Sequence, residues 1–269
     1  MDSKHTLNKH PVGHPYGVSL SCDDKMTLSS VPHRELTLKD SKIFMDFTVG
    51  ALQTHHISED CLDIIKKEIL SLKIKGLDAS ILSPYPPEDT NHVHTRKSNF
   101  AEVVMTEYLK ATTSLGLPIY KLRYNPNVRQ SMKGDDTLLF DLYTNPVRII
   151  VGESKFRKTS CKEAVGEIIS GLVRSAEDTL PVSLPFVYTM LFKQGKVELA
   201  RKVLDCVHLI LENAIKIEYV GFLLSNEKVS GHVEEHTTNK LSNLSMISLG
   251  VPSPENMVHE AFERLEGSL

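Results

Sequence analysis

The most constraining feature of the sequence is a pair of short apolar segments separated by a turn signal. Residues 137–143 (TLLFDLY) and 147–153 (VRIIVGE) are rich in large and β-branched apolar side chains, and Asn145-Pro146 lies between them. Apolar runs on either side of such a turn are typical of neighbouring strands. The second run is apolar enough to predict a central strand buried on both faces. The pair therefore predicts a β-hairpin within a larger sheet.

Helical and extended patterns alternate around this hairpin. Asn99 with Glu102, and Ser160 with Glu163, have the spacing of capping boxes, which predicts helices from residue 99 to about 113 and from residue 160 onward. Further strands are predicted at 42–49, 119–124 and 219–224, and further helices begin near residues 58, 196 and 253. The order predicts an α/β fold in which helices flank a mixed central sheet.

The pattern also divides the chain. Residues 1–40 are polar and lack a clear period, which predicts a loosely ordered N-terminal arm. Residues 41–97 are interpreted as an N-terminal α/β extension that ends in a proline-rich surface loop at 83–97, and residues 98–225 as the core. The core is expected to carry a helical insertion at about 181–216, and residues 226–269 to form a loop and a helix packed on it.

Composition limits the possible classes. The chain has 269 residues with 31 Lys and Arg against 34 Asp and Glu, so its net charge of −3 does not by itself favour nucleic-acid binding. The four cysteines are widely spaced, and no signal peptide or long apolar run occurs. We therefore expect a cytoplasmic protein with no membrane span.

Charged residues gather at one end of the predicted hairpin. Asp135 and Asp136 precede the first strand, and Glu153 and Lys155 end the second. Residues two apart on a strand point to the same face, and the hairpin returns the chain, so one of the two aspartates can lie beside Glu153 and Lys155. Asp136 is favoured because it is closer to the strand. The sequence therefore predicts two carboxylates and one ammonium at a single edge of the sheet.

This combination suits metal-assisted chemistry on phosphate esters. Hard carboxylate oxygens suit Mg²⁺, and Mn²⁺ is a possible substitute. Such a metal polarises a phosphoryl oxygen and lowers the pKa of a bound water. A neighbouring lysine orients that water or neutralises charge in the transition state. The expected reaction is hydrolysis of a phosphodiester bond.

An aspartate followed by Glu-x-Lys across a hairpin resembles the restriction-endonuclease-like nuclease superfamily, PD-(D/E)xK. Its α-β-β-β-α-β core agrees with the predicted order of elements between about residues 98 and 225. More narrowly, the runs Phe100-Ala101-Glu102, Gly134-Asp135-Asp136 and Gly152-Glu153-Ser154-Lys155-Phe156 resemble the HamA family of the Hachiman anti-phage defence system.

The resemblance implies a role for four residues. Asp136 and Glu153 match the metal-binding acids, Lys155 matches the catalytic lysine, and Glu102 matches a position where many members supply a further catalytic and metal-binding acid. It implies a Mg²⁺-dependent deoxyribonuclease that works with a helicase partner of the HamB type. Residues 1–95 and 181–216, which the nuclease core explains least, are where we expect partner contacts.

Basic residues flank the predicted site on both sides. Five of them are predicted to bind DNA phosphates: Arg129, Lys133, Arg157, Lys158 and Lys162. The alternative is an ordinary solvated face.

The helix predicted from residue 99 to about 113 carries two glutamates. Glu102 could be only the capping partner of Asn99 rather than a site residue. Glu107 lies on a different face of that helix. Gly166 and Gly171 are expected to let their helix pack closely on the sheet.

Other functions stay open at this point. The chain could be a stand-alone restriction or repair nuclease, or a catalytically inactive interaction protein with the same fold. Residues 232–236 (HVEEH) match an inverted zinc-peptidase pattern, whose chemistry requires a helix. Because polar residues surround this run, we expect it to lie in a loop and to bind no zinc.

Overall fold

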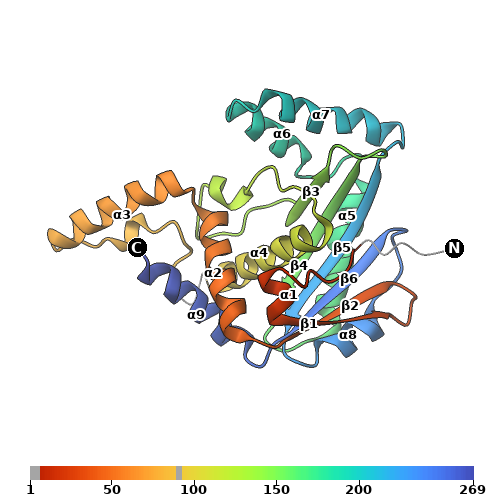
Figure 1. Ribbon diagram of the computed structural model, residues 1–269, viewed down its shortest axis with the longest axis horizontal. Helices are drawn as coiled ribbons and strands as arrows, with labels where there is room; N and C mark the ends of the chain where they lie inside the picture. Colours follow the sequence, from red (N-terminus) through yellow and green to blue (C-terminus); the bar gives the residue numbers. More distant parts are fainter. Residues whose placement is uncertain (1–6, 89–92) are drawn as a thin grey trace.

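The computed structural model describes residues 7–88 and 93–269 and is built around one six-stranded sheet (Figure 1). The strands are β1 (Leu20–Met26), β2 (Pro32–Leu38), β3 (Thr137–Asp141), β4 (Arg148–Phe156), β5 (Lys216–Ser225) and β6 (Leu244–Gly250), in the spatial order β1-β2-β6-β5-β4-β3. The β1–β2 and β3–β4 pairs are antiparallel, and the three central pairs are parallel. The predicted α/β fold with a mixed central sheet is confirmed.

Helices cover both faces of this sheet (Figure 1). Their bounds are α1 (Pro15–Ser19), α2 (Ser41–His56), α3 (Glu59–Ile74), α4 (Val93–Thr113), α5 (Lys162–Glu177), α6 (Leu184–Lys193), α7 (Val197–Leu211), α8 (Val229–His236) and α9 (Pro254–Gly267), with 3-10 turns η1 (Ser80–Leu82) and η2 (Lys121–Tyr124). Helix α4 packs on β3, β4 and β5 with α2 and α9 behind it, and α5 packs with α8 on the opposite face.

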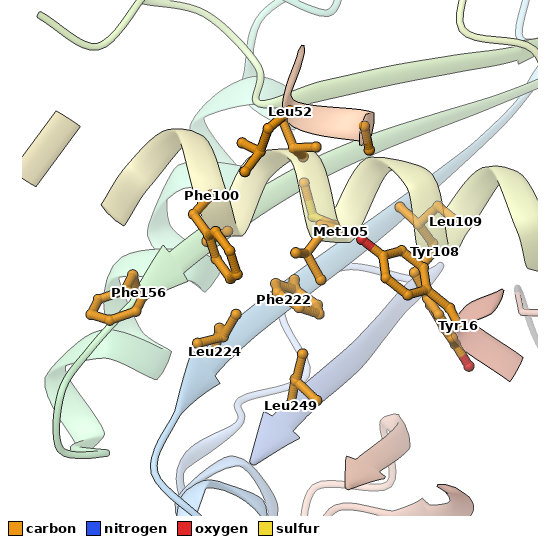
Figure 2. Close-up of a cluster of buried hydrophobic side chains, with 14 of the residues drawn as sticks. Tyr16, Leu52, Phe100, Met105, Tyr108, Leu109, Phe156, Phe222, Leu224 and Leu249 are labelled. Carbon is orange, nitrogen blue, oxygen red and sulfur yellow. The ribbon is translucent and has the colours of Figure 1, made fainter. Parts of the chain in front are cut away.

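The apolar core has two halves, one on each face of the sheet, because successive side chains of β4 point to opposite faces. Ile150 faces the α4 side, whereas Ile149 and Val151 face α5. On the α4 side, Phe100 and Met105 lie over Phe222 of β5 (Figure 2). Burying one such side chain stabilises the fold by about 1.5–3 kcal/mol. The sheet is therefore held rigidly from both sides near the end of β4.

The hairpin prediction is confirmed, since β3 pairs with β4 in the register Thr137↔Gly152. The strand at 219–224 is found as β5, and the helices expected near 58, 196 and 253 are α3, α7 and α9. Helix α5 also forms, but the predicted capping box is wrong. Its N-cap is Cys161, and the hydroxyl of Ser160 donates instead to the amide oxygen of Asn226.

Three other local predictions are wrong. Residues 42–49 belong to α2, whose buried side chains Phe44, Met45, Thr48 and Leu52 recur at helical spacing. Residues 119–124 form no strand but end in the 3-10 turn η2, and an isolated bridge joins Gly116 to Phe140. The loop predicted at 83–97 is found at residues 83–88 but is wrong at 93–97, which belong to α4; the residues between them lie outside the described part of the chain. Short apolar runs fit either period, so tertiary packing decides between them.

The prediction of a loosely ordered N-terminal arm is wrong for its described part, residues 7–40. Strands β1 and β2 extend the sheet, and β2 runs parallel to β6. Arg34 is buried, and its guanidinium donates two hydrogen bonds to Asp24, at 2.7 and 2.8 Å. Such pairing allows polar strand residues to lie inside the fold. The predicted C-terminal loop is likewise wrong, since residues 226–250 contain α8 and β6.

All four cysteines are free thiols. Within residues 7–88 and 93–269, no helix combines the length and the apolar character that crossing a membrane requires.

Two buried histidines couple stability to pH. In α2, His56 donates from Nδ1 to the carbonyl of Leu52 at 2.8 Å, and its Nε2 accepts from Asn99 at 3.0 Å, which is the pattern of a neutral ring. Burial lowers the pKa of His56 to about 4, and that of His33 likewise to about 4. Between about pH 6.5 and pH 4 the unfolded chain therefore binds protons that the folded chain does not.

The free energy of unfolding is expected to fall as the pH drops from about 6.5 to about 4, by up to about 3 kcal/mol for each histidine. Urea denaturation at a series of pH values measures this slope. The variant His56→Gln should show a clearly smaller slope, while His94→Gln, at an exposed position, should leave it unchanged. An unchanged slope in His56→Gln would contradict the assignment.

Candidate active site

The hairpin brings three predicted residues to one place. Asp136 directly precedes β3, and the register Thr137↔Gly152 sets it beside Glu153. The Nζ atom of Lys155 lies 2.6 Å from Oε1 of Glu153. Oδ2 of Asp136 accepts hydrogen bonds from the backbone N–H and the hydroxyl of Ser154, both at 2.8 Å. Ser154, which the sequence did not single out, therefore holds the Asp136 carboxylate in place.

Asp135 is turned toward a different part of the fold. It is buried, and its carboxylate accepts from the Ser175 hydroxyl at 2.7 Å and from the Ser183 backbone N–H at 2.8 Å. Its own N–H donates to Oγ of Ser183 at 2.8 Å. Asp135 therefore ties the start of β3 to α5 and to the segment before α6. Asp136 is left as the aspartate that faces Glu153.

Glu102 reaches the same place from α4. It is buried, and its Oε2 lies 3.3 Å from Nζ of Lys121. The capping alternative is wrong, because α4 begins at Val93 and the side chain of Asn99 is engaged with His56. Glu107 lies outside the site, as expected, and pairs with His55 and Lys110.

The three carboxylates repel one another. Burial raises the pKa of Glu102 to about 8, with further contributions from the charges of Asp136 and Glu153, while Lys121 opposes the rise. Burial and the charge of Asp136 also raise the pKa of Glu153, and Lys155 opposes this. Crowded, partly buried carboxylates disfavour their own ionised forms, so a nearby cation stabilises them.

These residues have the donor chemistry that a hard divalent cation requires. Glu102, Asp136 and Glu153 offer oxygen ligands at a site with more acids than lysines, which suits Mg²⁺ with water and phosphate as further ligands. Within residues 7–88 and 93–269, no three acidic, histidine or cysteine side chains already form a finished ligand cluster. Instead, Lys121 and Lys155 contact the acids. The donor chemistry fits a hard cation, and in this structure the acids are paired with lysines instead.

Helix α5 approaches the site closely at Gly171. A Cβ atom there would lie 2.9 Å from Cδ and 3.0 Å from Oε1 of Glu153. The expected close packing is therefore confirmed at Gly171, where the missing side chain leaves room for the carboxylate. It is wrong for Gly166, where a Cβ would meet no atom within 4 Å.

The five basic residues predicted to bind phosphate fall into two groups. Arg157 pairs with Glu167 at 2.5 Å, and Lys158 pairs with Glu255 at 2.8 Å. Arg129, Lys133 and Lys162 are exposed and make no ion pair with any residue that the structure describes. Exposed ion pairs are weak, so the first two cations are also available to a polyanion.

The run at 232–236 lies on helix α8, so the predicted loop is wrong. The rings of His232 and His236 lie 5.8 Å apart between centroids, and the glutamate of the pattern, Glu235, lies 3.8 Å from Nε2 of His236. The described residues gather no third ligand beside the two histidines.

Comparison with known proteins supports the narrower of the two resemblances. The sequence model of the HamA family matches residues 15–265, a range that contains β1 and β2 as well as every residue of the candidate site. The chain is also 36% identical over 267 residues to the Hachiman protein HamA of Bacillus cereus, an alignment that covers 98% of this chain and 95% of that protein. The chain therefore belongs to the HamA family of the Hachiman anti-phage defence system.

Proposed function

We propose that the protein is a Mg²⁺-dependent nuclease that hydrolyses phosphodiester bonds in DNA. The observation that carries the proposal is that Asp136, Glu153 and Lys155 lie together at the end of the hairpin. Glu102, a residue of α4, lies at the same place. Oxygen ligands beside an ammonium are the parts that metal-assisted phosphodiester hydrolysis needs.

Each side chain has a separate task in this proposal. Glu102, Asp136 and Glu153 would hold Mg²⁺, or Mn²⁺ in its place, and the bound metal would activate water and polarise the phosphoryl oxygen. Lys155, held by Glu153 at 2.6 Å, orients the attacking water and neutralises charge that develops on the phosphate. Ser154 keeps Asp136 in one orientation through two hydrogen bonds.

Local rather than overall charge would bind the DNA. The net charge is −3, so long-range attraction of the whole chain for DNA is weak. Arg129, Lys133 and Lys162, together with Arg157 and Lys158, supply the phosphate contacts around the site. Weak attraction suits a nuclease to which a second component brings the DNA.

We propose that this second component is a helicase of the same defence system, acting in the cytoplasm. Helix α3 projects from the rest of the molecule (Figure 1) and exposes Ile64, Leu70 and Ile74. Exposed apolar side chains on a projecting helix favour contact with another protein. They lie within residues 1–95, where the sequence predicts partner contacts.

The test is cleavage of supercoiled plasmid DNA by the purified chain, with and without the proposed helicase partner. We expect cleavage with Mg²⁺ or Mn²⁺, none with EDTA, and strong stimulation by the helicase. Glu153→Gln and Lys155→Met should each lower the rate by roughly 100-fold or more. The control Glu263→Gln changes an exposed glutamate on α9, outside the segments predicted for partner contacts, and should retain full activity.

Other results would favour the other functions. Full cleavage by the chain alone would indicate a stand-alone nuclease. Cleavage that survives both Glu153→Gln and Lys155→Met would place the chemistry elsewhere. The absence of cleavage under every condition would support a non-catalytic interaction protein. Faster cleavage of RNA than of DNA would identify RNA as the substrate.

A further inference from the structure

Lys121 occupies a central place between the acids of the candidate site. Its Nζ atom lies 3.3 Å from Oε2 of Glu102 and 3.8 Å from Oδ1 of Asp136, and it donates a hydrogen bond to the backbone carbonyl of Asp135 at 2.8 Å. The lysine side chain is 11% exposed, and the two carboxyl side chains are 7% and 16% exposed. The ammonium is therefore held inside the fold by three oxygen contacts.

The local structure explains why this lysine stays there. Lys121 begins η2, and Ile119 and Leu122 on either side of it are buried. These two apolar side chains anchor the segment, so the ammonium does not depend on its acid partners alone. Lys155 contacts Glu153 instead, which leaves Lys121 as the cation shared by Glu102 and Asp136.

We infer that Lys121 is the internal counter-ion of Glu102 and Asp136 and competes with the divalent metal for their oxygens, so that it sets the metal affinity of the site. The inference rests on the proposed function, because it concerns the same carboxylates. A unit positive charge a few ångströms from a metal position opposes a second cation strongly in a partly buried site. Removing a buried charge also leaves its partners uncompensated, and they then favour any cation that can enter.

The experiment measures Mn²⁺ binding to the full chain by electron paramagnetic resonance of the free ion. We expect Lys121→Met to bind Mn²⁺ at least about tenfold more tightly than the unchanged protein. Lys121→Arg keeps the charge and should bind no more tightly than the unchanged protein. Lys110→Met is the matched control, since Lys110 pairs with another buried glutamate, Glu107, at 2.8 Å. Its Mn²⁺ affinity should equal that of the unchanged protein.

A second measurement needs no variant at Lys121. Acylation of the unchanged protein, followed by mass spectrometry, reports the accessibility of each lysine. Reaction at Lys121 should speed up when Mg²⁺ is added, because the metal displaces the ammonium from the acids. Reaction at Lys110 should stay constant.

The metal site and the competition by Lys121 can be refuted separately. If Asp136→Asn abolishes Mn²⁺ binding but Lys121→Met binds Mn²⁺ equally or more weakly, the metal site stands and the competition is wrong. Unchanged acylation of Lys121 at saturating Mg²⁺ would likewise contradict the competition between Lys121 and the metal. If neither the unchanged protein nor Lys121→Met binds Mn²⁺, both the metal site and this inference are overturned.

Discussion

Replacing Gly171 by alanine is expected to lower the rate of DNA cleavage by roughly 100-fold or more without lowering the stability of the protein. The added Cβ would lie 2.9 Å from Cδ of Glu153, which is closer than real Cβ atoms approach, and 3.1 Å from Cγ, which is tighter than most real contacts. The end of the glutamate side chain is the flexible partner, so the carboxylate moves and the α5 backbone stays. A shift of about 1 Å in a reacting group is enough for an effect of this size.

Stability is not expected to fall with the cleavage rate. Gly171 lies inside α5, and alanine in a helix interior is favoured over glycine by up to about 1 kcal/mol. Displacing the Glu153 carboxylate also moves it relative to Asp136, whose charge already raises the pKa of Glu153. Thermal melting in EDTA is expected to show a melting temperature equal to or above that of the unchanged protein.

Gly166→Ala provides the matched control on the same helix. A Cβ at residue 166 meets no atom within 4 Å, so this variant should gain helix stability and keep its cleavage rate. Plasmid cleavage time courses with Mg²⁺ compare the two variants directly. Unimpaired cleavage by Gly171→Ala would mean that the position of the Glu153 carboxylate is not critical.

The elements that could be predicted from the sequence are those whose signals are local. The hairpin is determined by two apolar runs and a turn, and it appears as the antiparallel pair β3 and β4. Its ends carry Asp136, Glu153 and Lys155, so their proximity follows from the pairing of neighbouring segments. The structure brings these three side chains together. The narrow family resemblance, which rests on the residues around them, is confirmed by the family match over residues 15–265.

The elements that were missed depend on partners far away in the chain. Strand β2 is polar in sequence, but it pairs with β6, where Leu36 lies opposite Leu249. Nothing within residues 1–40 indicates that partner. Residues 42–49 show the second difficulty, because a short apolar run is compatible with either period until packing on α4 selects the helix.

The candidate site likewise combines features that local sequence predicts with features that depend on the tertiary structure. Glu102 was predicted for its position, but its burial and its contact with Lys121 required the tertiary structure. Lys121 lies in a segment that the sequence predicts as a strand, and this prediction gave no reason to direct its side chain toward the acids. Gly171 was expected to pack closely, yet only the fold reveals that its neighbour is the Glu153 carboxylate.

Substitution of the two adjacent aspartates is expected to separate stability from catalysis. Asp135→Ala should lower the free energy of unfolding by about 3 kcal/mol, because it leaves the buried Ser175 hydroxyl and Ser183 N–H without their acceptor. Asp136→Ala should change that free energy by less than about 1 kcal/mol. It removes two hydrogen bonds from Ser154 but also removes a charge that repels Glu102 and Glu153.

Cleavage should respond in the reverse order. Asp136→Ala is expected to be inactive although folded, because it lacks a proposed metal ligand, whereas the folded fraction of Asp135→Asn, which keeps the shape of the side chain, should still cut DNA. Urea denaturation and plasmid cleavage on the same preparations give both quantities. A stable but inactive Asp135→Asn beside an active Asp136→Ala would reverse the assignment and make Asp135 the metal-binding acid. The two serine contacts of Asp135 argue against that result, since its carboxylate oxygens are already engaged by α5 and by the residue before α6.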